Sequence, residues 1–120
     1  LVAKWMGLAD DIAISLAPKS VTTPIAIEVT RMLHGIEPIT VMAVMTTGFL
    51  GNIFGISLLS WFHIKSPMAK GISLGTASHA LGIMAAFNLS EKYAVYASLG
   101  MIFNGIFTAL IAPTVVHLLF

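Results

Sequence analysis

Three long stretches of the chain are apolar and free of charged side chains, and short polar segments separate them. They cover residues 38–62, 71–90 and 93–120. An α-helix rises about 1.5 Å per residue, so about 20 consecutive apolar residues are enough to cross a bilayer. Each stretch reaches that length, and the pattern therefore predicts membrane-spanning helices.

A fourth apolar region, residues 9–33, is interrupted at its centre by a polar segment with a proline at each end. Pro18 and Pro24 lack a backbone N–H and clash with the preceding turn, which excludes a continuous helix. We expect two half-helices around an unwound centre, which together cross the membrane once. The alternative is an amphipathic helix at the membrane interface, followed by a loop.

Residues 71–90 also contain a polar centre, with the sequence GTASH at positions 75–79. Glycine gives the backbone the freedom that a break would need. The sequence leaves three alternatives open for this segment: a second broken span, an unbroken helix that packs tightly through its glycines, and a re-entrant hairpin.

Glycines recur at helical spacing along two of the apolar stretches. A helix face without side chains lets a second helix approach closely, and Gly51 with Gly55 forms a GxxxG motif. The predicted helix-packing residues are Gly48, Gly51, Gly55, Gly71, Gly75 and Gly82.

Two apolar segments share a weak internal similarity. The sequence GFLGNIFGI at residues 48–56 agrees with GMIFNGIFT at residues 100–108 in its first glycine and its asparagine. Each copy follows a segment with a polar centre. A repeated unit of one discontinuous and one continuous span would fit transporters that bind their substrate between two repeats. Apolar sequences also agree by chance.

The composition supports a membrane location. Hydrophobic residues make up 58% of the 120 residues and charged residues 9%, whereas a soluble domain carries about 25% charged residues. We predict an all-α integral membrane protein with about four transmembrane segments, one or two of them discontinuous, in a single membrane domain over residues 1–120.

Charge and residue usage argue against several functions. The net charge of +1 is too small to indicate nucleic-acid binding. The sequence has no cysteine, which excludes disulfides, cysteine-bound zinc and thiol catalysis. Its four histidines have no metal-binding spacing. We therefore expect no metal, no cofactor and no enzymatic activity.

The interruption in residues 9–33 combines groups that bind an anion. A lysine at membrane depth needs a negative partner. The candidates for Lys19 are Glu28, a substrate carboxylate and the bilayer surface, which the long side chain can reach by snorkelling. The helix that begins at Pro24 directs free N–H groups into the same interruption, and three hydroxyl residues lie between the prolines. This combination favours a small carboxylate over a sodium ion. The alternative is that Lys19 belongs to a loop at the membrane interface.

His79 lies beside Thr76 and Ser78 in the second polar centre. A histidine within a membrane can relay protons; the alternative is a structural histidine that forms a hydrogen bond. The predicted substrate-binding residues of both centres are Lys19, Ser20, Thr22, Thr23, Thr76, Ser78 and His79.

Three segments also resemble the signature stretches of a known family. PKSVTTPIA at residues 18–26, GTASHALG at residues 75–82 and GIFTALIAP at residues 105–113 are similar to motifs of the LrgB/CidB family. The similarity runs along essentially the whole chain. Family members are roughly twice as long, so we expect this chain to be the C-terminal part of a longer protein.

The chain departs from the family pattern at two places. HGIEP at residues 34–38 stands where the family has a turn with paired glycines, and Ile83 and Met84 stand where small residues usually follow Gly82. The second departure bears on how tightly the chain packs beside His79.

The resemblance implies a multi-pass protein of the bacterial cytoplasmic membrane, with chloroplast relatives. The family is described as antiholin-like, acting on murein hydrolase activity and lysis together with a small LrgA/CidA-type membrane partner. Relatives are also linked to the transport of pyruvate and of glycolate or glycerate.

Two functions follow as hypotheses. The first is transport of a small monocarboxylate, with a proton as the candidate coupling ion, through the predicted substrate-binding residues. The second is antiholin-like regulation of murein hydrolase activity by helix association with an LrgA/CidA-type partner, through Gly51 and Gly55 and through Gly71 and Gly75. We further expect contact with the lipid bilayer, a homo-oligomer and no nucleic-acid partner.

Overall fold

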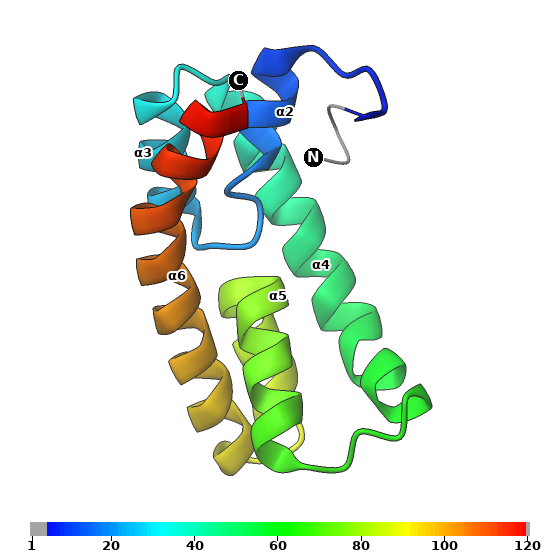
Figure 1. The fold of residues 1–120 in the computed structure, drawn as a ribbon. Coiled ribbons are helices and arrows are strands. Elements are labelled where there is room, and N and C mark those ends of the chain that lie inside the picture. The colour runs from blue at the N-terminus through cyan, green and yellow to red at the C-terminus, as the bar shows by residue number, and fades with distance from the viewer. Residues whose placement is uncertain (1–4, 120) are drawn as a thin grey trace.

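The computed structural model describes residues 5–119, without the side chain of residue 119. Over these residues the chain is helical and contains no strand, which confirms the predicted all-α class. The helices are α2 (Asp10–Leu16), α3 (Thr23–Met32), α4 (Glu37–Trp61), α5 (Pro67–Phe87) and α6 (Glu91–Leu119) (Figure 1).

Two helices, rather than four segments, have the length and composition to cross a membrane. They are Glu37–Trp61, which is all of α4, and Glu91–Leu118 in α6. Helices α2 and α3 contain only 7 and 10 residues, and a crossing needs about 20. The prediction of about four transmembrane segments is therefore wrong for the described residues, because the other two apolar regions fold back on themselves.

Helices α4 and α6 run along the length of the molecule in opposite directions (Figure 1). The principal extents are 40 × 25 × 23 Å, and the long axis matches a helix of 25 residues at about 1.5 Å per residue. The pair α2–α3 lies at one end of the molecule and α5 at the other (Figure 1). The α2–α3 pair and α5 each extend along only part of the length of α4 and α6.

The chain reverses direction between α2 and α3. The carbonyl oxygen of Ser15, near the end of α2, accepts a hydrogen bond from the Thr40 hydroxyl at 2.8 Å. Thr30, near the end of α3, bonds to the same hydroxyl at 2.8 Å. Between them in sequence, Val21 packs one turn further along α4, against Val44. The two short helices therefore form a hairpin, and the predicted single crossing is wrong because the interruption turns the chain back.

Helix α5 reverses at its centre, between a first arm (residues 67–77) and a second arm (residues 80–87). His79 has φ +44° and ψ −132°, far from helical values. The arms lie side by side (Figure 1): a Cβ on Gly82 would collide with the carbonyl oxygen of Leu74, although a straight helix would separate these residues by about 12 Å. Of the three alternatives that the sequence left open, the backbone has the hairpin.

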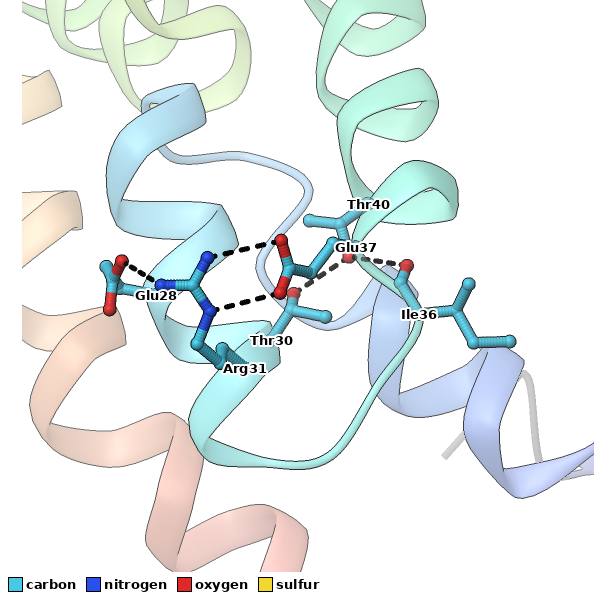
Figure 2. Close-up of polar contacts among 6 residues, drawn as sticks. All are labelled: Glu28, Thr30, Arg31, Ile36, Glu37 and Thr40. Carbon is cyan, nitrogen blue, oxygen red and sulfur yellow. Dashed lines mark hydrogen bonds and ion pairs between the residues drawn. The ribbon is translucent and has the colours of Figure 1, made fainter.

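A buried polar cluster ties the first hairpin to the start of α4. Thr30 and Thr40 are fully buried, and their hydroxyls lie 2.8 Å apart (Figure 2). The hydroxyl of Ser15 accepts a hydrogen bond from the Ile36 N–H at 2.6 Å. Buried polar groups need such partners, so α2, α3 and the beginning of α4 are held as one unit.

Arg31 links α3 to α4 at the surface (Figure 2). Its guanidinium donates to Glu28 at 2.8 Å and to the two carboxylate oxygens of Glu37 at 3.1 and 3.3 Å. The hydrogen bond with Glu37, followed by the charges of Glu28 and Glu37, raises the pKa of Arg31. Glu28 is therefore engaged by Arg31 and is not the partner of Lys19.

Candidate functional site

The tips of the two hairpins meet beside α6. The first tip is the non-helical segment at residues 17–22. The second tip is residues 76–79, which are the end of the first arm and the reversal of α5. The Asn104 amide nitrogen of α6 donates to the carbonyl oxygen of Ser20 at 2.8 Å and to that of Thr76 at 3.0 Å. One side chain thus joins the two polar centres that the sequence singled out.

The first tip exposes its charge and buries its apolar side chain. Lys19 is exposed, and its Nζ donates to the Ser20 hydroxyl at 3.3 Å. Val21 is 1% exposed and is fixed against α4. Within the part of the chain that the structure describes, the ion pairs involve Arg31 and not Lys19. A cation held only by a neutral hydroxyl is free to bind an anion.

The first turn of α3 lies at the same tip. Thr22 is the N-cap residue, in an extended conformation, and its side chain makes no capping hydrogen bond. Helix N–H groups in the first turn have no partner within the helix, and the helix dipole favours negative charge there. Thr22 and Thr23 are half-buried. The predicted hydroxyl residues therefore accompany a helix N-terminus that suits a carboxylate.

His79 fixes the second tip to α4. It is 5% exposed, and its Nε2 lies 3.0 Å from the carbonyl oxygen of Val44. A carbonyl oxygen only accepts hydrogen bonds, so Nε2 carries the hydrogen. Gly48 provides the space, since a Cβ there would lie 2.7 Å from the imidazole ring. A positive φ in a residue with a side chain costs about 1–3 kcal/mol, which this contact helps to offset.

The other two predicted residues of the second tip are engaged within the chain. Ser78 is 2% exposed and faces Gly51, where a Cβ would collide with the Ser78 hydroxyl. The Thr76 hydroxyl donates to the carbonyl oxygen of Ile72 at 2.8 Å, inside the first arm. Thr76 therefore contributes to the meeting of the tips through its main-chain carbonyl rather than through its hydroxyl.

A cavity of about 480 Å³ lies between α4 and the first arm of α5. Its lining is mostly apolar, and Thr47, Ser73 and Ser78 supply the hydroxyls. Of the predicted substrate-binding residues, only Ser78 lines it. Apolar walls suit a hydrocarbon chain better than a carboxylate. The cavity reaches the second tip at Ala77 and Ser78, but neither Asn104 nor a residue of the first tip lines it.

The six glycines predicted for helix packing lie at contacts within the chain. Those on α4 face α5, and those on α5 face α6 or the opposite arm. A Cβ on Gly75 would collide with the backbone of Ala97, and a Cβ on Gly71 would lie 2.6 Å from the carbonyl oxygen of Tyr93. A Cβ on Gly55 would lie 2.6 Å from the Leu74 side chain. These glycine faces are therefore occupied inside the chain.

Sequence reasoning did not identify Asn104 as a site residue. The available signal was the weak repeat, in which Asn104 corresponds to Asn52. Asn52 instead lines a cavity of about 320 Å³ together with Ile83 and Phe87 of the second arm. The two asparagines hold equivalent sequence positions in different surroundings, and the repeat alone does not say which of them contacts a tip.

Comparison with known proteins finds relatives along nearly the whole chain. The LrgB-like family matches residues 1–118. The holin-like protein CidB of Staphylococcus aureus is 33% identical over 120 residues, which are 100% of this chain and 52% of the relative. The protein of the same name from Staphylococcus epidermidis is 35% identical over 117 residues, 98% of this chain and 51% of the relative.

A third relative is the uncharacterized protein YwbG of Bacillus subtilis, 39% identical over 113 residues, 94% of this chain and 50% of the relative. No solved structure matches the chain. The chain spans about half the length of these curated relatives. Two helices able to cross a membrane, together with bacterial relatives of holin-like name, indicate a membrane protein. The family match over residues 1–118 establishes that this chain belongs to the LrgB-like family.

Proposed function

We propose that this chain forms part of a membrane transporter for a small monocarboxylate of the pyruvate or glycolate type, with a proton as the candidate coupling ion. The observation that carries the proposal is the meeting of two hairpin tips at Asn104. Transporters commonly build a substrate site from helix ends that meet near the middle of the bilayer, with half-helix N-termini directed at anionic groups.

The distribution of charge supports hairpins that enter the membrane from opposite sides. Asp10 begins α2 and Glu37 begins α4, whereas Lys70 lies in the first turn of α5 and Glu91 begins α6. The beginnings of α2 and α4 lie at one end of the molecule and those of α5 and α6 at the other (Figure 1). Lys19 lies instead at a tip. If α4 and α6 cross the membrane, Lys19 is a charged side chain within the bilayer. A charged group there needs an anionic partner or a water-filled cavity.

The predicted residues of the first tip would contact the substrate directly in this proposal. Lys19 neutralises the carboxylate, and the α3 N-terminus adds its N–H groups. The hydroxyls of the first tip orient the substrate, and the second tip closes the site. Because Nε2 of His79 donates to Val44, Nδ1 is the nitrogen that would take up a transported proton. The full set of predicted residues is Lys19, Ser20, Thr22, Thr23, Thr76, Ser78 and His79.

Uptake of labelled pyruvate into vesicles that contain the intact protein tests the proposal. We expect saturable uptake that increases with an imposed pH gradient and is inhibited by glycolate. Vesicles without the protein give the background. The absence of saturable uptake of pyruvate, glycolate and glycerate by the folded protein would rule out this function.

The names of the staphylococcal relatives favour a second candidate, a regulator of lysis that acts through helix association. The glycine faces first considered for such an association are occupied within the chain. A membrane partner would therefore bind exposed apolar side chains such as Phe49 and Ile53 of α4, which are 57% and 65% exposed. Co-purification with an LrgA/CidA-type protein that is lost in Phe49→Ser, without a change in pyruvate uptake, would support this candidate.

A further inference from the structure

Asn104 contacts both hairpin tips from a third element, α6. Its side chain is half-buried, and the amide nitrogen reaches the main-chain carbonyls of Ser20 and Thr76 at 2.8 and 3.0 Å. Both partners are carbonyl oxygens, which only accept, so both amide hydrogens are used. The orientation of the amide group is therefore determined by its partners.

Both carbonyls lie where the regular hydrogen bonding of a helix ends. Ser20 lies in the non-helical first tip, and Thr76 lies in the last turn of the first arm, where carbonyl groups have no partner within the helix. Within a bilayer no water replaces the missing donor, and an unpaired carbonyl is costly. Asn104 supplies a donor to each tip.

The close packing of α6 against α5 brings Asn104 within reach. A Cβ on Gly100, one turn before Asn104, would lie 2.8 Å from the carbonyl oxygen of Ile72. On the other side of Asn104, a Cβ on Gly105 would lie 3.1 Å from the Ile25 side chain of α3. The asparagine is thus flanked by two glycines that let α6 approach the elements on which the two tips are built.

We propose that Asn104 is a positioning residue that holds the two tips at a fixed separation. The first tip carries Lys19 and the α3 N-terminus, and the second carries His79. With Asn104 in place, the first tip keeps a fixed position relative to the second; without Asn104 the tips separate and the site loses its shape. What the site binds rests on the proposed function, whereas the positioning role of Asn104 does not.

Four substitutions in the intact protein separate this role from a general effect on stability. Asn104→Leu keeps a similar volume and removes both donors. Asn104→Asp keeps the shape but places a carboxylate against two carbonyl oxygens. Asn104→Gln keeps both donors on a longer side chain and should rescue partly. Asn52→Leu is the matched control, because Asn52 holds the equivalent position of the repeat in α4.

The separation of the tips is measured directly with nitroxide labels on cysteines at Pro24 and Ala80, both exposed in this chain. Any other cysteine of the intact protein is replaced first. We expect a narrow distribution of label distances in the wild type, in Asn52→Leu and, slightly wider, in Asn104→Gln. We expect a broad distribution in Asn104→Leu and Asn104→Asp.

Uptake kinetics give the second measurement. The KM for pyruvate should rise about tenfold in Asn104→Asp, the scale of one lost hydrogen bond, and recover partly in Asn104→Gln. If Asn104→Leu does not fold, Asn104→Asp carries the test. Unchanged distances and an unchanged KM in a folded Asn104→Asp variant would overturn the proposal. If the distances broaden but the wild type takes up no carboxylate, the positioning role stands and the proposed function fails.

Discussion

The Nε2 atom of His79 and the carbonyl oxygen of Val44 lie 3.0 Å apart, and both residues are buried. This bond connects the point where α5 reverses to the first third of α4. The imidazole therefore fixes the second tip to α4, and it belongs to a residue with φ +44°. Glycine adopts such a conformation more easily than histidine does. The hydrogen bond of the imidazole explains why a histidine stands at this position.

Replacement of His79 tests the importance of this bond. Glutamine can place an N–H donor near the Val44 carbonyl oxygen, whereas leucine cannot and leaves a buried carbonyl without this partner. We expect His79→Leu to lower the free energy of unfolding by about 1–3 kcal/mol and His79→Gln to lower it less. Thermal unfolding of the purified protein in detergent measures the difference. Equal stability of the two variants would contradict a structural role for the imidazole.

The same glutamine variant examines proton coupling. Histidine is the side chain whose charge ordinarily changes between about pH 5 and 8, and glutamine does not titrate. If His79 relays a proton, His79→Gln should remain folded while the pH dependence of pyruvate uptake becomes flat over that range. A pH profile like that of the wild type would leave His79 with its structural role alone.

The sequence located both hairpin tips but not their geometry. Pro18 and Pro24 mark the first interruption, because proline acts on the local backbone. The second lies within the predicted stretch from Gly75 to His79, but its non-helical residues are Ser78 and His79 rather than the glycine. Whether a chain continues across the membrane or turns back after an interruption is decided by distant partners. Thr40 fixes the two helices of the first hairpin, and no local pattern identifies such a partner.

The candidate site, like the fold, was predictable from the sequence only where its residues are neighbours along the chain. The hydroxyl residues and Lys19 are recognisable from their positions between two prolines. The role of Asn104 depends on two main-chain carbonyls that are far from it in sequence. Every residue has a main-chain carbonyl, so the residue types do not show which carbonyls Asn104 contacts. The signal that the sequence offered was the agreement of Asn104 with Asn52 in the weak repeat.

Gly75 should not accept even a single methyl group. A Cβ at this position would collide with the backbone of Ala97, which cannot move aside as a side chain does. We expect Gly75→Ala to lower the free energy of unfolding by about 1–3 kcal/mol, as overpacking usually does. Gly55→Ala is the matched control, because its new Cβ would meet only the end of the Leu74 side chain. Similar effects of the two variants would mean that α5 and α6 are less closely packed than described.

The hairpin in α5 predicts which residues share a side of the membrane. Ser66 and Glu91 are exposed and flank the two open ends of α5. Cysteines at these positions in the intact protein should react with an impermeant reagent from the same side. A cysteine at His34, which is exposed at the opposite end of α4, should react from the other side. Labelling of Ser66→Cys and Glu91→Cys from opposite sides would mean that α5 crosses the membrane.

Lys19 is the residue on which the transport proposal depends most. Among the described residues, its Nζ donates a hydrogen bond to the Ser20 hydroxyl and forms no ion pair, and a carboxylate would provide the missing negative partner. Lys19→Met keeps the length of the side chain and removes the charge, so folding should be unaffected or slightly improved. Pyruvate binding should weaken tenfold or more, since a hydrogen bond to a charged group contributes about 1.5–3 kcal/mol.

Two further variants show whether the charge or the shape of Lys19 matters. Lys19→Arg keeps the charge but presents a larger, planar group with different geometry, so it should restore binding only in part. Ser20→Ala removes one neutral hydroxyl and should weaken binding less than Lys19→Met does. The KM of pyruvate uptake and the binding of pyruvate to the purified protein measure both effects. Normal uptake by Lys19→Met would exclude the carboxylate site at the first tip, because no other cation among the described residues lies at a hairpin tip.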